Sequence, residues 1–224
     1  LADGVAATLP AGSSAGGEQA KFLACRGDDG AALLVKFTPP RGTPFGERWH
    51  DLLHAEALAL ETLAAHGAAV AGTRIVETAR RTYLESQRFD RVGLAGRRHA
   101  VPLWAAHEAF VPGPRQHWAA TCDALAAQGR LSVEAAAQVR ALLHFGRLIG
   151  NSDMHSGNLS FFVDLDGLRG LPKGRFSLAP VYDMLPMVFA PADGQLVERR
   201  FAPDGARADT LEAWPRAHAL AQRK

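Results

Sequence analysis

The residues best suited to chemistry lie in one short polar segment and at one Asp further along the chain. The segment runs from Gly150 to Asn158 and contains Asp153, and Asp183 follows later. A carboxylate fixed on a loop can accept the proton of an attacking hydroxyl. An amide oxygen and a second carboxylate are hard ligands that suit Mg²⁺. Asp153, Asn158 and Asp183 therefore form a candidate site for phosphoryl transfer.

Each of these residues also has an ordinary structural explanation. Asp153 and Asn158 are residue types found in many turns, and Asp183 could cap a helix. Their joint spacing favours function, because an Asp-x4-Asn pattern with a later Asp is the arrangement of protein-kinase-type enzymes. We place His155 among the nucleotide-binding residues as a side chain that shapes the loop, since a second base beside Asp153 would be redundant.

A lysine within an apolar strand is the next candidate. Residues 31–37 predict a buried strand that contains Lys36. The 25 basic residues are nearly all Arg, and the lysines are Lys21, Lys36, Lys173 and Lys224. Lys36 is expected to neutralise nucleotide phosphates, and the alternative is a strand-edge Lys directed into solvent. Glu56, on the following helix, stands where a kinase keeps the acidic partner of this Lys.

Two further segments could contact a nucleotide. Residues 9–17 form a small-residue loop whose backbone N–H groups can bind phosphate, although a flexible linker is the favoured interpretation of this segment alone. Its candidate residues are Ser13, Ser14, Ala15, Gly16 and Gly17. Gln87 to Phe89 would form a hinge that offers backbone groups to an adenine edge. An ordinary strand end is the alternative.

The elements that must position these groups follow a definite order. The hydrophobic pattern predicts strands over 19–25, 31–37, 73–76, 82–89, 159–163 and 176–181. A loop over 41–48 precedes a helix over 49–65, and a second helix runs from the N-cap Ser132 to Gly150. Irregular or short helical segments are expected over 91–130. This is the serial order of a two-lobed kinase.

The first predicted helix also carries two histidines one turn apart. His50 and His54 stand at i and i+4, which is a spacing that suits a metal ion. No third ligand is recognisable near them in the sequence. Surface histidines are therefore the favoured interpretation.

Composition restricts the protein's class. Of the 224 residues, 47% are hydrophobic and 21% charged, as in ordinary globular proteins. The net charge of +2 argues against direct nucleic acid binding, and no apolar run is long enough to span a membrane. Cys25 and Cys122 are too few for a disulfide framework, so a cytoplasmic location is expected.

Several motifs together resemble the HipA-type serine/threonine kinases, the toxins of bacterial toxin–antitoxin pairs and their stand-alone homologues. The motifs are Ser13 to Phe22, Lys36, Arg88-Phe89-Asp90-Arg91, Gly150 to Asn158, and Leu178 to Asp183. The resemblance spans about residues 10–187 and implies an α+β, bilobal protein-kinase-like fold. A β-rich N-lobe would occupy residues 1–90, and a mainly helical C-lobe with a catalytic-loop β-hairpin would occupy residues 91–224.

The resemblance also implies cofactors, partners and residue roles. ATP and Mg²⁺ would be the cofactors, and a protein serine, as in the aminoacyl-tRNA synthetases that relatives modify, would be the acceptor. An antitoxin would be a further partner. Asp153 would be the base, Asn158 and Asp183 the metal ligands, and Lys36 the phosphate ligand. Gln87 and Phe89 would contact adenine, and Ser13, or else Ser14, would be autophosphorylated.

The sequence also differs from full-length members of this family, and two other functions are possible. Full-length relatives carry a domain before the glycine-rich loop and a longer helical region after Asp183, so a truncated kinase core is expected. A small-molecule phosphotransferase of the aminoglycoside- or choline-kinase type shares the Asp-x4-Asn pattern. A non-catalytic nucleotide-binding module is the third possibility. It would be expected to lack Asp153, Asn158, Asp183 or Lys36, and all four are present.

Overall fold

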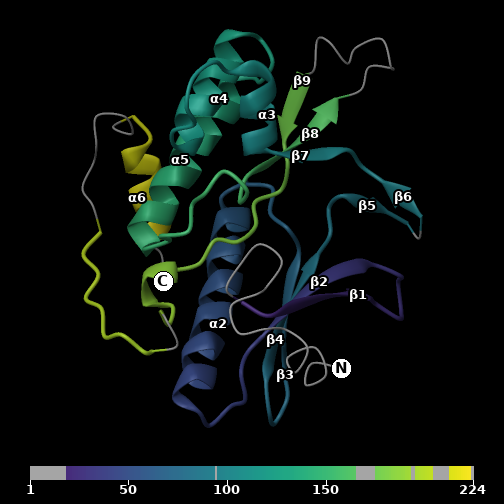
Figure 1. Cartoon of the computed structure of the whole chain (residues 1–224), viewed down its shortest axis with the longest axis vertical. Helices are drawn as coiled ribbons and strands as arrows, with labels where there is room; N and C mark the ends of the chain where they lie inside the picture. The colour runs from purple at the N-terminus through teal and green to yellow at the C-terminus, as the bar shows by residue number, and fades with distance from the viewer. Residues whose placement is uncertain (1–18, 94, 165–174, 193–194, 204–211, 223–224) are drawn as a thin grey trace.

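The chain forms antiparallel strands and helices in the computed structural model, which describes residues 19–93, 95–164, 175–192, 195–203 and 212–222. The elements are β1 (Lys21–Cys25), β2 (Ala32–Phe37), α2 (Pro44–Ala65), β3 (Thr73–Glu77), β4 (Thr82–Gln87), β5 (Arg91–Val92), β6 (Gly96–Arg97), β7 (Ala100–Pro102), α3 (Leu103–Phe110), α4 (Trp118–Ala127), α5 (Val133–Ile149), β8 (Ser160–Asp164), β9 (Arg175–Leu178), the 3₁₀ helix η2 (Met187–Phe189) and α6 (Trp214–Ala221). In Figure 1 the long helix α2 lies beside the first sheet, and α3, α4 and α5 gather beyond its end.

The first sheet has four antiparallel strands in the order β1-β2-β4-β3. Within β2, Leu33, Val35 and Phe37 are buried. Because side chains alternate along a strand, Leu34 and Lys36 lie on the opposite face from these three. The predicted strand over 31–37 is thus confirmed, and its alternation directs Lys36 away from the apolar face.

Helix α2 begins earlier than predicted. The expected loop over 41–48 ends at Thr43, whose Oγ1 accepts the N–H of Gly46 at 3.0 Å, and Pro44 opens the helix. A proline is compatible with the first helical turn, since the N–H it lacks has no partner there. A Cβ on Gly46 would collide with the carbonyl oxygen of Pro40. The Pro and Gly therefore belong to a helix start and not to a loop.

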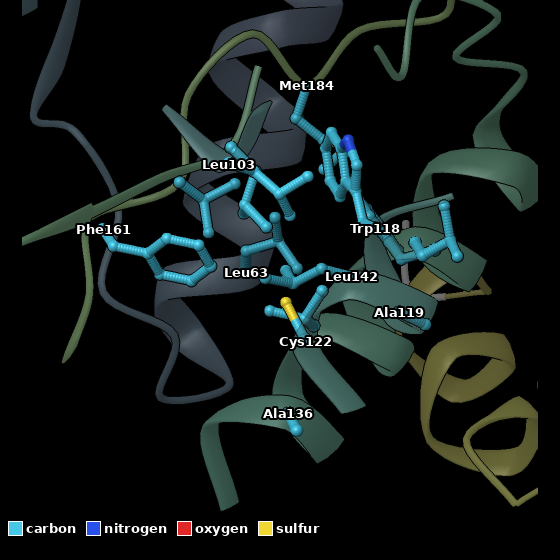
Figure 2. Close-up of a cluster of buried hydrophobic side chains, with 14 of the residues drawn as sticks. Leu63, Leu103, Trp118, Ala119, Cys122, Ala136, Leu142, Phe161 and Met184 are labelled. Carbon is cyan, nitrogen blue, oxygen red and sulfur yellow. The ribbon is translucent and has the colours of Figure 1, made fainter. Parts of the chain in front are cut away.

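Helix α5 has both ends that its sequence predicts. Ser132 Oγ accepts the N–H of Ala135 at 3.1 Å, and Gly150 ends the helix in the left-handed conformation with φ of 79°. The helix contributes to the main hydrophobic core. Figure 2 shows side chains of α2, α3, α4, α5 and β8 meeting there, among them Leu63, Leu103, Trp118, Leu142 and Phe161. This core fixes the end of α5 from which residues 151–158 begin.

Residues 91–130 contain more regular structure than predicted. The short helices α3 and α4 agree with the expectation, whereas the short strands β5, β6 and β7 were not predicted. Strand β7 joins a three-stranded sheet in the order β7-β8-β9 and places Val101 opposite Phe161. Three residues are too few for a periodic pattern, and their partner lies far along the chain. None of the described helices is long and apolar enough to cross a membrane.

Candidate active site

Lys36 connects two carboxylates that come from distant parts of the chain. Its Nζ lies 2.7 Å from both carboxylate oxygens of Glu56 on α2 and also forms an ion pair with Asp183. The side chains of Lys36 and Glu56 are almost completely buried. The expected acidic partner of Lys36 is confirmed. The alternative of a solvent-directed lysine is excluded.

Burial and charge act against each other in this cluster. Burial alone would lower the pKa of Lys36, but the attraction of Glu56 and Asp183 is stronger and raises it. Burial likewise acts to raise the pKa of Asp183, but the Lys36 ammonium holds it below the usual range. Burial raises the pKa of Glu56 despite Lys36. Lys36 and Asp183 are therefore charged near neutral pH.

Asp183 has an unusual backbone conformation. Its φ of 53° is the only positive value at a non-glycine position among the described residues. Such conformations are costly and persist where surrounding contacts hold them, often at functional sites. Here the carbonyl oxygen of Asp183 accepts a hydrogen bond from Asn151 Nδ2 at 3.1 Å. This contact fixes the turn that directs the carboxylate toward Lys36.

Asn151 also holds the segment that contains Asp153. Its Oδ1 accepts the backbone N–H of Asp153 at 3.1 Å, so one buried amide joins this loop to Asp183. Asn158 Nδ2 donates to the carbonyl oxygen of Asp153 at 2.9 Å. The Asp153 side chain is 46% exposed, and its Oδ1 lies 3.6 Å from His155 Nε2. The carboxylate is thus open to a substrate while its backbone is fixed.

Two aromatic side chains support the same loop. The Tyr182 hydroxyl donates to the carbonyl oxygen of Gly157 and shares a hydrogen bond with Ser160 Oγ, each at 2.7 Å. Burial raises the pKa of Tyr182 to about 12, so the phenol stays neutral and can donate. Trp118 Nε1 donates to the carbonyl oxygen of His155 at 2.9 Å. These roles, like that of Asn151, were not identified from the sequence. Asn151 and Tyr182 lie within the recognised segments, and this proximity was their only signal.

A cavity of about 310 Å³ opens beside Lys36. Its lining combines apolar residues of the first sheet with the charged cluster: Leu23, Leu34, Lys36, Glu56, Ser86, Gln87, Arg88, Phe89, Asp90, Tyr182 and Asp183. The volume is at the lower end of the range for small-molecule sites, about 300–1,000 Å³. An apolar wall beside a fixed ammonium suits a ligand with a flat base and an anionic group.

The predicted hinge forms one wall of this cavity. The Phe89 ring lies 5.6 Å from that of Tyr182, and Arg88 and Asp90 flank it as an ion pair, with Arg88 Nη2 2.6 Å from Asp90 Oδ2. The N–H of Gln87 already donates to Gly72, and that of Arg88 to Ala32. An adenine contact at Gln87 or Phe89 would therefore use other backbone groups or the Phe89 ring.

The structure brings only some of the predicted residues together. Lys36, Gln87, Phe89 and Asp183 line the cavity. Asp153, His155 and Asn158 lie on the adjoining loop, which Asn151 joins to Asp183, but they are not part of the lining. The glycine-rich segment lies outside the described residues, and its positions are Ser13, Ser14, Ala15, Gly16 and Gly17.

The donor atoms fit a magnesium-bound polyphosphate. Mg²⁺ prefers oxygen ligands, which the Asp183 carboxylate and the Asn158 amide can offer. Because Asn158 Nδ2 donates to Asp153, its Oδ1 is the atom suited to a cation. Lys36 supplies a compact positive charge for a phosphate. The loop and the cavity thus offer, between them, oxygen ligands for a cation and a positive charge for a phosphate.

Solved structures identify the fold first. The HipA, HipB and operator DNA complex of Shewanella oneidensis MR-1 contains a chain with a TM-score of 0.58 and 24% identity; the match covers 79% of this chain and 44% of that one. The Helicobacter pylori proinflammatory kinase CtkA matches with a TM-score of 0.51 and 16% identity, over 77% of this chain and 55% of that one. At these identities the likeness shows the fold, which is that of HipA and CtkA.

The family follows from the sequence. The model of the HipA-like C-terminal domain matches residues 13–223, and the chain belongs to this family. It is also 43% identical over 183 residues to Toxin YjjJ of Escherichia coli (strain K12). That match covers 80% of this chain and 39% of the toxin, so the chain spans well under half of that relative's length. The resemblance to HipA-type proteins is confirmed.

Proposed function

We propose that this chain is the catalytic core of an ATP- and Mg²⁺-dependent protein serine/threonine kinase. The observation that carries the proposal is the position of Lys36 between Glu56 and Asp183, at a cavity that adjoins the Asp153 loop. The linkage of that loop to Asp183 through Asn151 supports one shared site. The division into an N-lobe over residues 1–90 and a C-lobe over residues 91–224 belongs to the same proposal.

Each residue has a distinct task in the proposed reaction. Bound ATP would supply the transferred phosphoryl group, with Mg²⁺ offsetting its charge. Lys36 orients the phosphates, and Glu56 fixes the position of the ammonium. Asp183 and the Oδ1 of Asn158 hold the cation. Asp153, the more exposed carboxylate, accepts the proton of the acceptor hydroxyl.

Partners and regulation are part of the proposal. The acceptor is a serine of another protein, of which an aminoacyl-tRNA synthetase is the kind that the HipA resemblance indicates. An antitoxin is a proposed partner, since one relative is named a toxin and the Shewanella structure contains HipA with HipB. Autophosphorylation at Ser13, or else Ser14, would place a dianion beside bound triphosphate and weaken its binding.

The test is phosphoryl transfer by the full protein. Purified wild type and Asp153→Asn are incubated with ATP and Mg²⁺, and the intact mass and tryptic peptides are measured. Wild type should gain one phosphate on the peptide that contains Ser13 and Ser14. Asp153→Asn should gain none, because an amide cannot accept the hydroxyl proton.

ATP binding, measured by titration calorimetry, separates the outcomes. Asp153→Asn should bind ATP in Mg²⁺ as wild type does, since Asp153 lies outside the cavity lining. Phosphorylation at the wild-type rate in Asp153→Asn would refute the assigned base. A wild type that does not bind ATP would refute the proposed function.

A further inference from the structure

Two histidines of α2 meet a glutamate from the first sheet on the outside of the molecule. His50 and His54 lie one helical turn apart, with ring centroids 4.4 Å apart. Glu77, the last residue of β3, places its Oε1 2.9 Å from His54 Nε2 and 4.0 Å from His50 Nδ1. A strand distant along the chain therefore brings a third candidate ligand to the histidine pair, which the sequence did not reveal.

We propose that His50, His54 and Glu77 form a binding site for Zn²⁺. One ligand atom from each residue lies within 4.8 Å of the others, and in the described part of the chain this is the only such group of three. Two imidazoles and a carboxylate are a common zinc ligand set, with the fourth position left to water. Tetrahedral ligands with bonds of about 2.0–2.1 Å stand roughly 3.3 Å apart, so small side-chain movements would close the group.

The three ligands are mounted on regular structure. His50 and His54 lie in the first half of a 22-residue helix, and Glu77 pairs with Thr82 in the sheet. Thr82 Oγ1 lies 2.8 Å from His50 Nδ1, so β4 also contacts the group. Ligands on a helix and a paired strand are held more accurately than ligands on loops. This placement favours a preorganised site over a chance contact between mobile side chains.

The surroundings allow an ion to enter but also oppose it. The side chains of His50, His54 and Glu77 are 19%, 44% and 52% exposed, so solvent reaches the group. Arg41 Nη1 lies 3.1 Å from His50 Nδ1, and its positive charge acts against a cation. Arg41 Nε is also bonded to Glu47 Oε1 at 3.1 Å, which gives the guanidinium another partner. Replacing Arg41 should therefore strengthen zinc binding.

An ion in this position would connect α2 to β3. Glu56, the partner of Lys36, lies two residues beyond His54 on the same helix. The zinc ligands include none of the residues proposed for Mg²⁺, and their imidazole nitrogens suit Zn²⁺ better than Mg²⁺. The two sites can therefore be tested separately, and the zinc site does not depend on the proposed kinase activity.

The test measures Zn²⁺ affinity by competition with a chromophoric chelator, in a buffer with millimolar Mg²⁺. Wild type should bind one Zn²⁺ per chain at this site. His54→Ala and Glu77→Gln should each weaken binding at least about tenfold, and Arg41→Gln should tighten it. His66→Ala, a change near the other end of α2, is the matched control and should bind as wild type does. Asp183→Asn should also keep its zinc affinity.

Thermal unfolding tests whether a variant loses zinc affinity because it is misfolded. In EDTA the variants should melt within a few degrees of wild type, because their side chains are partly exposed. Added Zn²⁺ should raise the Tm of wild type and of His66→Ala, but not that of His54→Ala. Equal zinc affinity in wild type and in His50→Ala/His54→Ala would overturn the proposal. The proposal would also be overturned if His66→Ala lost as much zinc affinity as His54→Ala does.

Discussion

The two halves of the candidate site are held in different ways. In the cluster of Lys36, Glu56 and Asp183, the first two side chains are buried and the third partly so, and opposite charges fix all three. The Asp153 loop is more exposed and is fixed by neutral hydrogen bonds that it makes with Asn151, Asn158 and Tyr182. The charged half therefore holds its side chains in fixed positions, which suits the proposed binding of ATP. The loop leaves the Asp153 carboxylate accessible, as the proposed transfer to an acceptor requires. Asn151 is the connection between them.

Removing the positive charge should have the largest effect. Lys36→Met leaves the buried carboxylate of Glu56 and the partly buried carboxylate of Asp183 without a cation. We expect a loss of about 3–5 kcal/mol in the free energy of unfolding and a fall in phosphoryl transfer of about 10³-fold or more. Denaturant unfolding and the initial rate of transfer measure the two effects.

The control for this change is Arg74→Met, because Arg74 is also a cation of the first sheet but is 58% exposed and pairs with Glu85 outside the cluster. It should leave both quantities close to wild type. If the two variants lost equal stability, the buried ion pairs of Lys36 would not be the cause.

Breaking the connection should have an intermediate effect. Asn151→Ala removes the hydrogen bonds to the Asp183 carbonyl oxygen and the Asp153 N–H. We expect a loss of about 1–3 kcal/mol and a fall in kcat of about 10²-fold through misplacement of the loop. ATP affinity should change much less, as titration calorimetry would measure. Asn151→Asp keeps an acceptor for the N–H of Asp153, and its kcat should fall between those of Asn151→Ala and wild type. An unchanged kcat in Asn151→Ala would show that Asn151 does not connect the two halves of the site.

Acid should weaken the charged half of the site. The pKa of Asp183 is lowered in the folded protein, so its ionised form stabilises the fold above the unfolded value of about 3.8. That contribution is lost as the pH falls from near 3.8 through the lower folded pKa. The free energy of unfolding, measured from pH 5 to pH 2, should fall more steeply in wild type than in Asp183→Asn. Parallel curves would contradict the ion pair with Lys36.

The smallest expected effect concerns the loop alone. Tyr182→Phe removes the hydroxyl that bonds Gly157 and Ser160 but keeps the ring beside Phe89. We expect a loss of about 1 kcal/mol in the free energy of unfolding and a reduction of a few fold in kcat. Chemical denaturation and steady-state kinetics measure these. Tyr182 also lines the cavity, so a KM for ATP raised more than kcat is lowered would show that the hydroxyl acts on the cavity and not on the loop.

The sequence was informative where a local pattern defined both an element and its residue. The apolar run of residues 31–37 and the scarcity of lysine identified Lys36, and the helix after it gave Glu56 as its partner. The ends of α5 followed from Ser132 and Gly150, as local caps do. These features need only near neighbours in the chain.

The features that were missed depend on contacts between distant segments. Asn151 acts by bonding a carbonyl group 32 residues away, and an asparagine in a turn carries no sign of such a partner. Glu77 meets His54 only because β3 packs against α2. The early start of α2 was missed because Pro44 and Gly46 resemble loop residues until their cap and packing are seen.

The most direct measurement is the affinity for ATP with and without Mg²⁺, by titration calorimetry on wild type and Asp183→Asn. If Asp183 holds the cation beside Lys36, Mg²⁺ should tighten ATP binding at least about tenfold in wild type and have little effect in the variant. An equal effect of Mg²⁺ on both proteins, or no ATP binding by wild type, would contradict the site.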